Sequence, residues 1–142
     1  MTIIPFEKKY RDDLIFMILE AKNALGVIPR LNEDLLDIDK NYLEKGDMFW
    51  LMIEEGRVIG SIGYNTLDKT DEVRLHRFYI KYNRKRQGIG SKLLETAESY
   101  LRMAGKTSVL VHLGGDAYVE SRCFYPKHGY VEFEPGYMRK YL

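Results

Sequence analysis

The chain has 142 residues, 45% of them hydrophobic, with 22 basic and 21 acidic side chains and a net charge of +1. This length suits a single domain over residues 1–142, with enough apolar side chains to form a core without disulfides or a metal. The balanced charge argues against a nucleic-acid or membrane partner. A lone cysteine, no long apolar run and no signal-like N-terminus lead us to expect a cytoplasmic protein.

The first half of the chain predicts a strand, two helices and a hairpin. Residues 3–6 predict a short strand, and residues 7–25 carry apolar side chains at helical spacing. Asn32 is a favoured N-cap for a second helix, which we expect to run to about Leu43. Two apolar runs, 48–53 and 58–64, flank a turn that contains Gly56 and predict a hairpin.

The second half predicts alternating strands and helices. In chain order these are a long strand over 72–82, an amphipathic helix from Gly88 or Ile89 to Gly105, a strand over 107–113, a short helix from Ala117 to about Tyr125, and strands over 130–134 and 137–141. The order β-α-α-β-β-β-α-β-α-β-β predicts an α/β (α+β) fold, in which helices cover both faces of a mixed sheet. The strand–helix–strand unit over 72–113 predicts two parallel strands.

The segment between the long strand and the amphipathic helix concentrates glycine and positive charge. Residues 81–92 contain five basic side chains and no acidic one. A helix N-terminus presents unpaired N–H groups and a partial positive charge, and Gly88 and Gly90 leave room for a phosphate to approach. Lys85 and Arg86 add charge, so the segment predicts a loop that binds a diphosphate. Alternatively, the glycines only allow a tight turn and the basic side chains are solvated.

Two familiar nucleotide-binding patterns do not fit this loop. The dinucleotide pattern G-x-G-x-x-G fails because position 93 is leucine. The Walker A pattern fails because Ser91 and Lys92 follow Gly90. The diphosphate therefore belongs to another class of ligand.

Several segments in the right order resemble one family. Lys85-Arg86-Gln87-Gly88-Ile89-Gly90 resembles the [Q/R]-x-x-G-x-[G/A] motif of the GNAT N-acetyltransferase superfamily, with lysine in the first place. The strand His76–Ile80 before it, the helix start Ser91–Leu94 after it, and Phe124–Tyr130, which resembles the F-Y-x-x-x-G-[F/Y] block, extend the likeness. The resemblance implies a GNAT-like fold and an acyltransferase that uses acetyl-coenzyme A as co-substrate and no metal.

The resemblance also implies which residues hold the coenzyme. The pyrophosphate would lie against the loop and the helix start, formed by Lys85, Arg86, Gln87, Gly88, Ile89, Gly90 and Ser91. The pantetheine would lie where the fourth and fifth strands diverge and would pair with backbone groups of Phe78 and Ile80. A backbone N–H near Phe78 would point at the thioester oxygen, where a donor stabilises the developing oxyanion.

The resemblance gives Tyr125 the role of protonating or hydrogen-bonding the leaving thiolate. The general base stays open. The family's glutamate on the fourth strand is replaced here by Arg74, and Glu72 and His76 share that strand face. We keep His76, Glu72 and a chain of waters as alternatives, and expect His112 and His128 to be structural. We expect Cys123 to be a small buried residue and not a nucleophile.

The expected function is transfer of an acetyl group from acetyl-coenzyme A directly to a primary amine of a small molecule or peptide. The alternatives are a non-catalytic module that senses acyl-coenzyme A and a nucleic-acid binder that uses residues 81–92. Six acidic residues between Glu33 and Asp47 either attract a cationic acceptor or form a solvated helix face. The final strand would offer an edge for a homodimer.

Overall fold

The computed structural model describes residues 1–115 and 118–142, which form a seven-stranded mixed sheet in the order β1-β2-β3-β4-β5-β7-β6. The strands are β1 Thr2–Pro5, β2 Phe49–Glu54, β3 Arg57–Thr66, β4 Glu72–Ile80, β5 Ser108–His112, β6 Val131–Glu134 and β7 Tyr137–Tyr141. The helices are α1 Arg11–Ala24, α2 Ile38–Asn41, α3 Ile89–Met103 and α4 Val119–Lys127, with short 3-10 helices η1 Lys8–Tyr10, η2 Glu33–Asp37 and η3 Leu43–Lys45. The predicted α/β (α+β) fold is confirmed.

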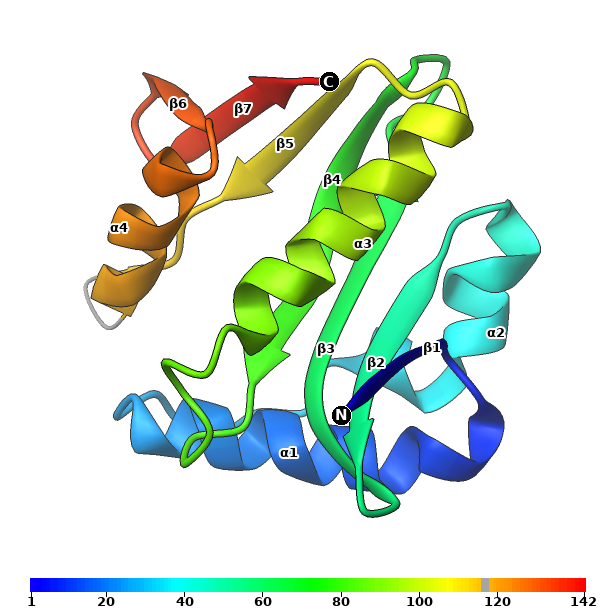
Figure 1. Ribbon diagram of the computed structural model, residues 1–142, viewed down its shortest axis with the longest axis vertical. Helices are drawn as coiled ribbons and strands as arrows, with labels where there is room; N and C mark the ends of the chain where they lie inside the picture. Colours follow the sequence, from blue (N-terminus) through cyan, green and yellow to red (C-terminus); the bar gives the residue numbers. More distant parts are fainter. Residues whose placement is uncertain (116–117) are drawn as a thin grey trace.

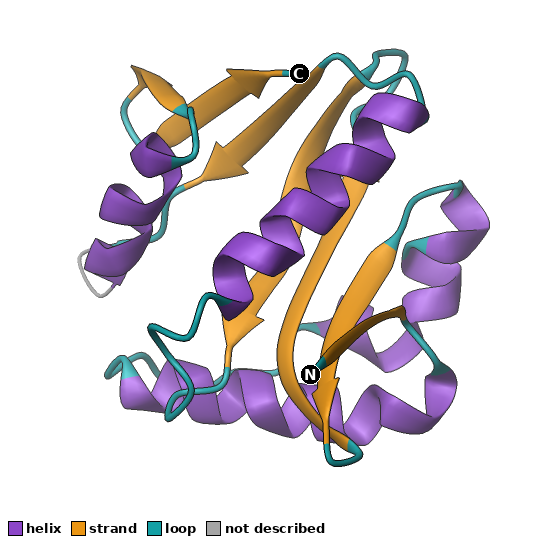
Figure 2. Cartoon of the chain, in the orientation of Figure 1, coloured by secondary structure: helices purple, strands orange, loops and turns teal. Residues whose placement is uncertain are grey.

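Helices cover both faces of the sheet, as expected (Figures 1 and 2). One face carries α3, whose apolar stripe packs on β2, β3 and β4 together with Tyr125 of α4. The other face carries α1, η2 and α2, which form a second apolar cluster with Phe49 and Leu51 of β2. The sheet is therefore covered by helices on both faces where β2, β3 and β4 lie.

The predicted parallel pair is β4 and β5, joined through α3. Only Glu72 to Arg74 of β4 pair with Ser108 to Leu110 of β5, although β4 continues to Ile80. β5 turns away and pairs along its whole length with β7. The two central strands therefore diverge beyond Arg74, and Figure 1 shows β4 and β5 separating toward the end of the sheet where α4 lies.

Some predicted elements differ from the structure. The second helix, expected over 32–43, is divided into η2, α2 and η3. Asn32 does not cap it, because its side-chain oxygen accepts a hydrogen bond from Lys22 Nζ at 2.6 Å. Ala117, the expected start of the short helix, lies outside the described residues.

The prediction that the last strand forms a free edge was wrong. β7 lies between β5 and β6, and β6 is the edge strand. The tight turn at Pro135 and Gly136 folds β7 back beside β6, and the same strand pairs with β5 on its other side. No helix among the described residues is long and apolar enough to cross a membrane.

The fold predicts which substitutions on α3 destabilise the protein. Leu93 is fully buried in the central cluster, whereas Met103 on the same helix is 88% exposed. Leu93→Ala should lower the free energy of unfolding by about 2 to 5 kcal/mol, because it leaves a cavity. Met103→Ala is the control and should change it by less than about 0.5 kcal/mol in urea unfolding. Equal effects of the two substitutions would contradict the packing described for α3.

Candidate functional site

The candidate site lies in the gap between β4 and β5. Arg74 is the last residue of β4 that pairs with β5, so Arg77 to Ile80 have no strand partner on that side among the described residues. Phe78 and Ile80 pack their side chains against the core under α3. Their backbone groups therefore border an opening in the sheet, where an extended ligand can pair with β4 in place of a strand.

A β-bulge in β4 shapes this opening. His76 pairs with Gly63 and Tyr79 pairs with Ser61, so two residues of β4 face one residue of β3. Arg77 takes the strain with a left-handed φ of 55°. Its carbonyl accepts a hydrogen bond of 2.7 Å from the Ser61 hydroxyl. A bulge bends its strand and changes the direction of the side chains and backbone groups that follow. The bulge therefore sets the direction in which the backbone groups of Phe78 point.

The glycine loop leads from β4 to the N-terminus of α3. Gly88 is the N-cap of α3 with φ 77°, a conformation that glycine adopts without strain. A Cβ at Gly90 would lie 3.4 Å from the Phe124 ring and 3.7 Å from the Phe78 ring, which are ordinary contact distances, so this position lies against both rings. Lys85 Nζ lies 3.2 Å from the Glu120 carboxylate of α4. The Ser91 hydroxyl lies 3.2 Å from His128 Nε2.

The structure brings this loop to the open end of the β4–β5 gap, because β4 ends at Ile80 and α3 begins at Ile89. The first turn of α3 carries no acidic residue, and Arg86 and Gln87 are exposed in the loop. The unpaired N–H groups of the helix N-terminus and the basic side chains therefore form a site suited to an anion such as a pyrophosphate.

Tyr125 lies beside Phe78, on the α3 face of the gap. The two ring centres are 6.2 Å apart, and Tyr125 is only 8% exposed. Burial raises the pKa of its phenol above the ordinary value of 10.0, so the hydroxyl stays protonated. Among the described residues nothing hydrogen-bonds this hydroxyl, whereas Tyr130 beside it donates to Glu98 at 2.7 Å. A buried phenol usually has a partner, so Tyr125 holds a donor ready for a ligand.

His76 lies on the opposite face of the sheet, and its neighbours set its tautomer. Its Nδ1 lies 2.8 Å from Oδ1 of Asn65. The amide nitrogen of Asn65 donates to the Asp47 carboxylate at 3.0 Å and to the Asn41 carbonyl at 3.1 Å. Because Asn65 Oδ1 can only accept, Nδ1 of His76 carries the proton and Nε2 keeps a free lone pair.

The charge state of His76 follows from its surroundings. Burial first, and then the cations Arg77 and Arg74, lower the pKa of His76 to about 4. The imidazole is therefore neutral at neutral pH and can accept a proton through Nε2. Asn65 and Asp47 were not predicted to contribute to this site. No sequence signal marks them, because β3 and the loop before β2 meet only in the folded sheet.

Glu72 is held away from His76. Its carboxylate accepts hydrogen bonds from Arg139 Nε at 2.6 Å and from the Ser108 hydroxyl at 2.8 Å. Burial alone would raise the pKa of Glu72, but these hydrogen bonds outweigh it and hold the pKa below 4.5. The structure therefore makes Glu72 an ionised partner of β7 and a poor proton acceptor.

Asp34 of η2 joins the acidic segment to the bulge. It forms a two-pronged ion pair with Arg77, at 2.8 and 3.0 Å, and accepts a 2.6 Å hydrogen bond from the Tyr42 hydroxyl. Asp47 is buried and bonded to Asn65 and Thr66. These two carboxylates are thus engaged within the protein, so they give little support to the idea that the acidic segment attracts a cationic acceptor.

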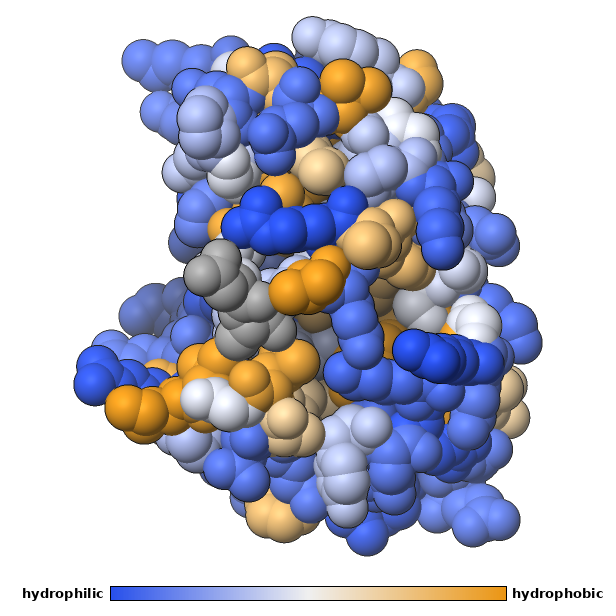
Figure 3. All heavy atoms as spheres, turned by 90° about the vertical axis from the view of Figure 1, so that its left-hand side faces the viewer, coloured by the Kyte–Doolittle hydropathy of each residue, from blue (hydrophilic) through white to orange (hydrophobic). Residues whose placement is uncertain are grey.

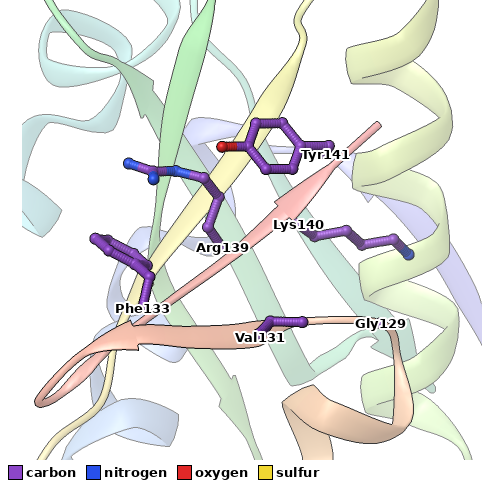
Figure 4. A pocket seen from close by; sticks show the side chains of 6 residues that line it. All are labelled: Gly129, Val131, Phe133, Arg139, Lys140 and Tyr141. Carbon is purple, nitrogen blue, oxygen red and sulfur yellow. The ribbon is translucent and has the colours of Figure 1, made fainter.

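Two further features lie outside the gap. Cys123 is exposed on α4, so the expectation of a buried cysteine was wrong. A hollow of about 400 Å³ lies on β6 and β7. Figure 4 shows the residues that line it, which are Gly129, Val131, Phe133, Arg139, Lys140 and Tyr141. Among the described residues, no group of three or more histidine, cysteine or acidic side chains could hold a metal ion.

A sheet that opens beyond a bulge, with a glycine loop and a helix N-terminus at the open end, defines a fold of the acyl-coenzyme A-dependent transferases. The model of the acetyltransferase (GNAT) domain matches residues 45–132. The chain belongs to this GNAT family.

Relatives agree with this assignment. Human N-acetyltransferase 8 is 30% identical over 86 residues, which are 57% of this chain and 38% of that protein, so the chain spans less than half of the relative's length. A GNAT-family acetyltransferase from Staphylococcus aureus Mu50 has the same fold with a TM-score of 0.90 at 24% identity, covering 99% of this chain and 98% of that one. The PaiA N-acetyltransferase from Thermoplasma acidophilum, solved with coenzyme A, has a TM-score of 0.75 at 20% identity, covering both chains fully.

The environment of His76 predicts its titration. In a nitrogen-resolved NMR titration, His76 should be neutral at pH 7 with the proton on Nδ1, and should become protonated only near pH 4. Because its folded pKa lies below the ordinary 6.5, it contributes stability that is lost as the pH falls between 6.5 and about 4. Asn65→Leu should remove the tautomer preference. Protonation of His76 near pH 6.5 in the wild type would contradict this environment.

The ion pair between Asp34 and Arg77 predicts a second pH dependence. Burial opposes the Asp34 charge, but hydrogen bonds from Arg77 and Tyr42 hold the pKa of its carboxyl below 3.8. The contribution of the Asp34 charge to the free energy of unfolding is therefore present above pH 3.8. It is lost as the pH falls through the lowered pKa of Asp34. Asp34→Asn should cost about 1 to 3 kcal/mol of unfolding free energy at neutral pH.

Urea unfolding of wild type and Asp34→Asn at several pH values measures this contribution. The difference between them should shrink below pH 3.8. Asp39→Asn on α2 is the control, because this carboxylate forms no ion pair with any residue that the structure describes. A difference between wild type and Asp34→Asn that does not change with pH would show that the ion pair is not its source.

Proposed function

We propose that this chain is a single-domain N-acetyltransferase that moves an acetyl group from acetyl-coenzyme A directly to a primary amine of a small molecule or peptide. The observation that carries the proposal is the placement of a neutral imidazole and a protonated phenol on opposite faces of one opening in the sheet. His76 faces the side of α1 and α2, and Tyr125 faces the side of α3. This arrangement suits a reaction in which the amine approaches on the His76 face and the thiolate leaves on the Tyr125 face.

The coenzyme would lie along the gap. Its pyrophosphate would lie against the segment from Lys85 to Ser91. Its pantetheine would pair with backbone groups of Phe78 and Ile80, which no described strand pairs with on the β5 side. The coenzyme A bound to the Thermoplasma PaiA protein, which shares this fold, supports the choice of ligand. The partly buried phenyl rings of Phe78 and Phe124 are 5.6 Å apart and would limit the access of water to the thioester.

The chemistry then follows from three groups. The amine nitrogen attacks the thioester carbon, and His76 Nε2 accepts the proton that the nitrogen loses. The backbone N–H of Phe78 donates to the oxygen that becomes negative in the tetrahedral intermediate. The carbon–sulfur bond breaks, an amide forms, and Tyr125 donates its proton or a hydrogen bond to the departing thiolate. Glu72 is not the base in this scheme, because Arg139 and Ser108 occupy its oxygens.

An assay of thiol release from acetyl-coenzyme A across a broad panel of amines tests the proposal. Tyr125→Phe should lower kcat by about 10²- to 10⁴-fold, because the thiolate loses its proton donor. The Kd for acetyl-coenzyme A from calorimetry should stay unchanged, because the ring still packs on Phe78. Tyr141→Phe, at a site 75% exposed, is the matched control and should retain full activity.

Two results would count against this mechanism. If no amine in the panel is acetylated although acetyl-coenzyme A binds tightly, the chain is a sensor of acyl-coenzyme A and not an enzyme. If amines are acetylated and Tyr125→Phe keeps its full kcat, Tyr125 is only a packing residue.

A further inference from the structure

Arg74 is a half-buried cation with one completely buried N–H donor. Its Nε is completely buried and has no hydrogen-bond partner in residues 1–115 and 118–142. No carboxylate of these residues forms an ion pair with it, whereas Arg77 pairs with Asp34 and Arg139 pairs with Glu72. A buried N–H donor without an acceptor is costly, and a ligand that supplies the acceptor is one explanation for its presence.

The polar neighbours of Arg74 are already engaged. In the sheet it lies between Asn65 of β3 and Leu110 of β5. The amide of Asn65 is used by Asp47, Asn41 and His76. The carboxylate of Glu72, two residues earlier on the same strand face, is held by Arg139 and Ser108. The missing acceptor for Arg74 therefore has to come from outside this set.

The position of Arg74 connects it to the site of acyl transfer. It is the last residue of β4 that pairs with β5, so it lies at the vertex of the gap. It shares a strand face with His76, two residues and about 7 Å further along. The positive charge of Arg74 helps to lower the pKa of His76. This effect agrees with a guanidinium on the same side of the sheet as His76.

The α1 side of the molecule, on which His76 lies, has a hollowed outline. Figure 3, in which the α1 side of the molecule lies at the left, shows the left outline hollowed between an upper and a lower lobe. Apolar side chains gather on the lower lobe in this view, and the segment after α1 carries exposed Ile28 and Leu31. In the proposed arrangement the acceptor approaches His76 from this side, opposite to Tyr125.

Resting on the acetyltransferase function proposed above, we infer that Arg74 binds a carboxylate of the acceptor, and that the acceptor is an amino acid with a free α-carboxylate. A guanidinium offers two parallel N–H donors that match the two oxygens of a carboxylate. In an α-amino acid the amine and the carboxylate share one carbon. A carboxylate held by Arg74 therefore keeps the amine within reach of His76. The bound anion also offsets the cation that lowers the pKa of His76, which makes the imidazole a better base.

Paired acceptors test this inference without any mutation. The L-amino acids and their α-carboxamides are compared as acceptors at saturating acetyl-coenzyme A, with each KM expressed for the unprotonated amine, because the carboxamide also makes the amine less basic. The acid of the preferred pair should have a KM about 10- to 100-fold lower than its amide, as charge-assisted hydrogen bonds predict. Equal KM values for acids and amides, or a preference for amides, would overturn the inference.

Two substitutions assign the effect to Arg74. Arg74→Gln should raise the KM for the acid about 10- to 100-fold and leave the KM for the amide unchanged. Arg74→Lys keeps the charge without the planar fork and should give an intermediate KM. Arg57→Gln, which removes an exposed arginine paired with Asp13, controls for the loss of one positive charge and should change neither KM. An equal loss with acid and amide in Arg74→Gln would make Arg74 structural.

The outcomes separate this inference from the function on which it rests. Acetylation of amines without regard to a carboxylate would leave the acetyltransferase function standing and reject the role of Arg74. No acetylation of any acid, amide or other amine, with acetyl-coenzyme A bound, would reject the function and the inference together. The Kd for acetyl-coenzyme A, measured for each variant, confirms that the variants are folded.

Discussion

Because β4 has one residue more than β3 between His76 and Tyr79, its backbone turns at Arg77, and most of the site depends on this bulge. Before the bulge, β4 pairs with β5, and Val73 and Leu75 point into the apolar cluster under α3. At the bulge, His76 and Arg77 both face the layer of α1 and α2. The strand then continues with Phe78 toward α3, and within the described part of the chain no strand pairs with it on the β5 side. A single inserted residue thus separates the structural part of β4 from the part that is open to a ligand.

The bulge is strained, and its surroundings hold it in place. Arg77 is a non-glycine residue with a positive φ, a conformation that costs free energy unless its contacts favour it. Those contacts are the ion pair with Asp34, supported by Tyr42, and the hydrogen bond from Ser61. Asp34 belongs to η2, so the segment that replaces the expected second helix is tied to β4. The broken helix follows from this geometry, because η2 has to bring Asp34 to the bulge.

The strands, the long helix and their order could be predicted because they depend on local patterns. The alternation in β4, the apolar stripe of α3 and the glycines before it are all visible in the sequence. Cys123 was wrongly predicted to be buried; it is exposed because it lies two residues from the buried Tyr125, on the opposite side of a helix with 3.6 residues per turn. The bulge and the hydrogen bonds of His76 were not predictable. No residue type marks a bulge at an arginine, and Asn65 and Asp47 reach His76 only through strand pairing.

The central claim is that acyl-coenzyme A occupies the gap between β4 and β5. An amide-resolved NMR titration of the protein with acetyl-coenzyme A tests it most directly. We predict the largest shifts at the backbone amides of Phe78 and Ile80 and at residues 86–91, with little change at the hollow on β6 and β7. Shifts confined to that hollow, or a Phe78 amide that does not respond at saturation, would contradict the account.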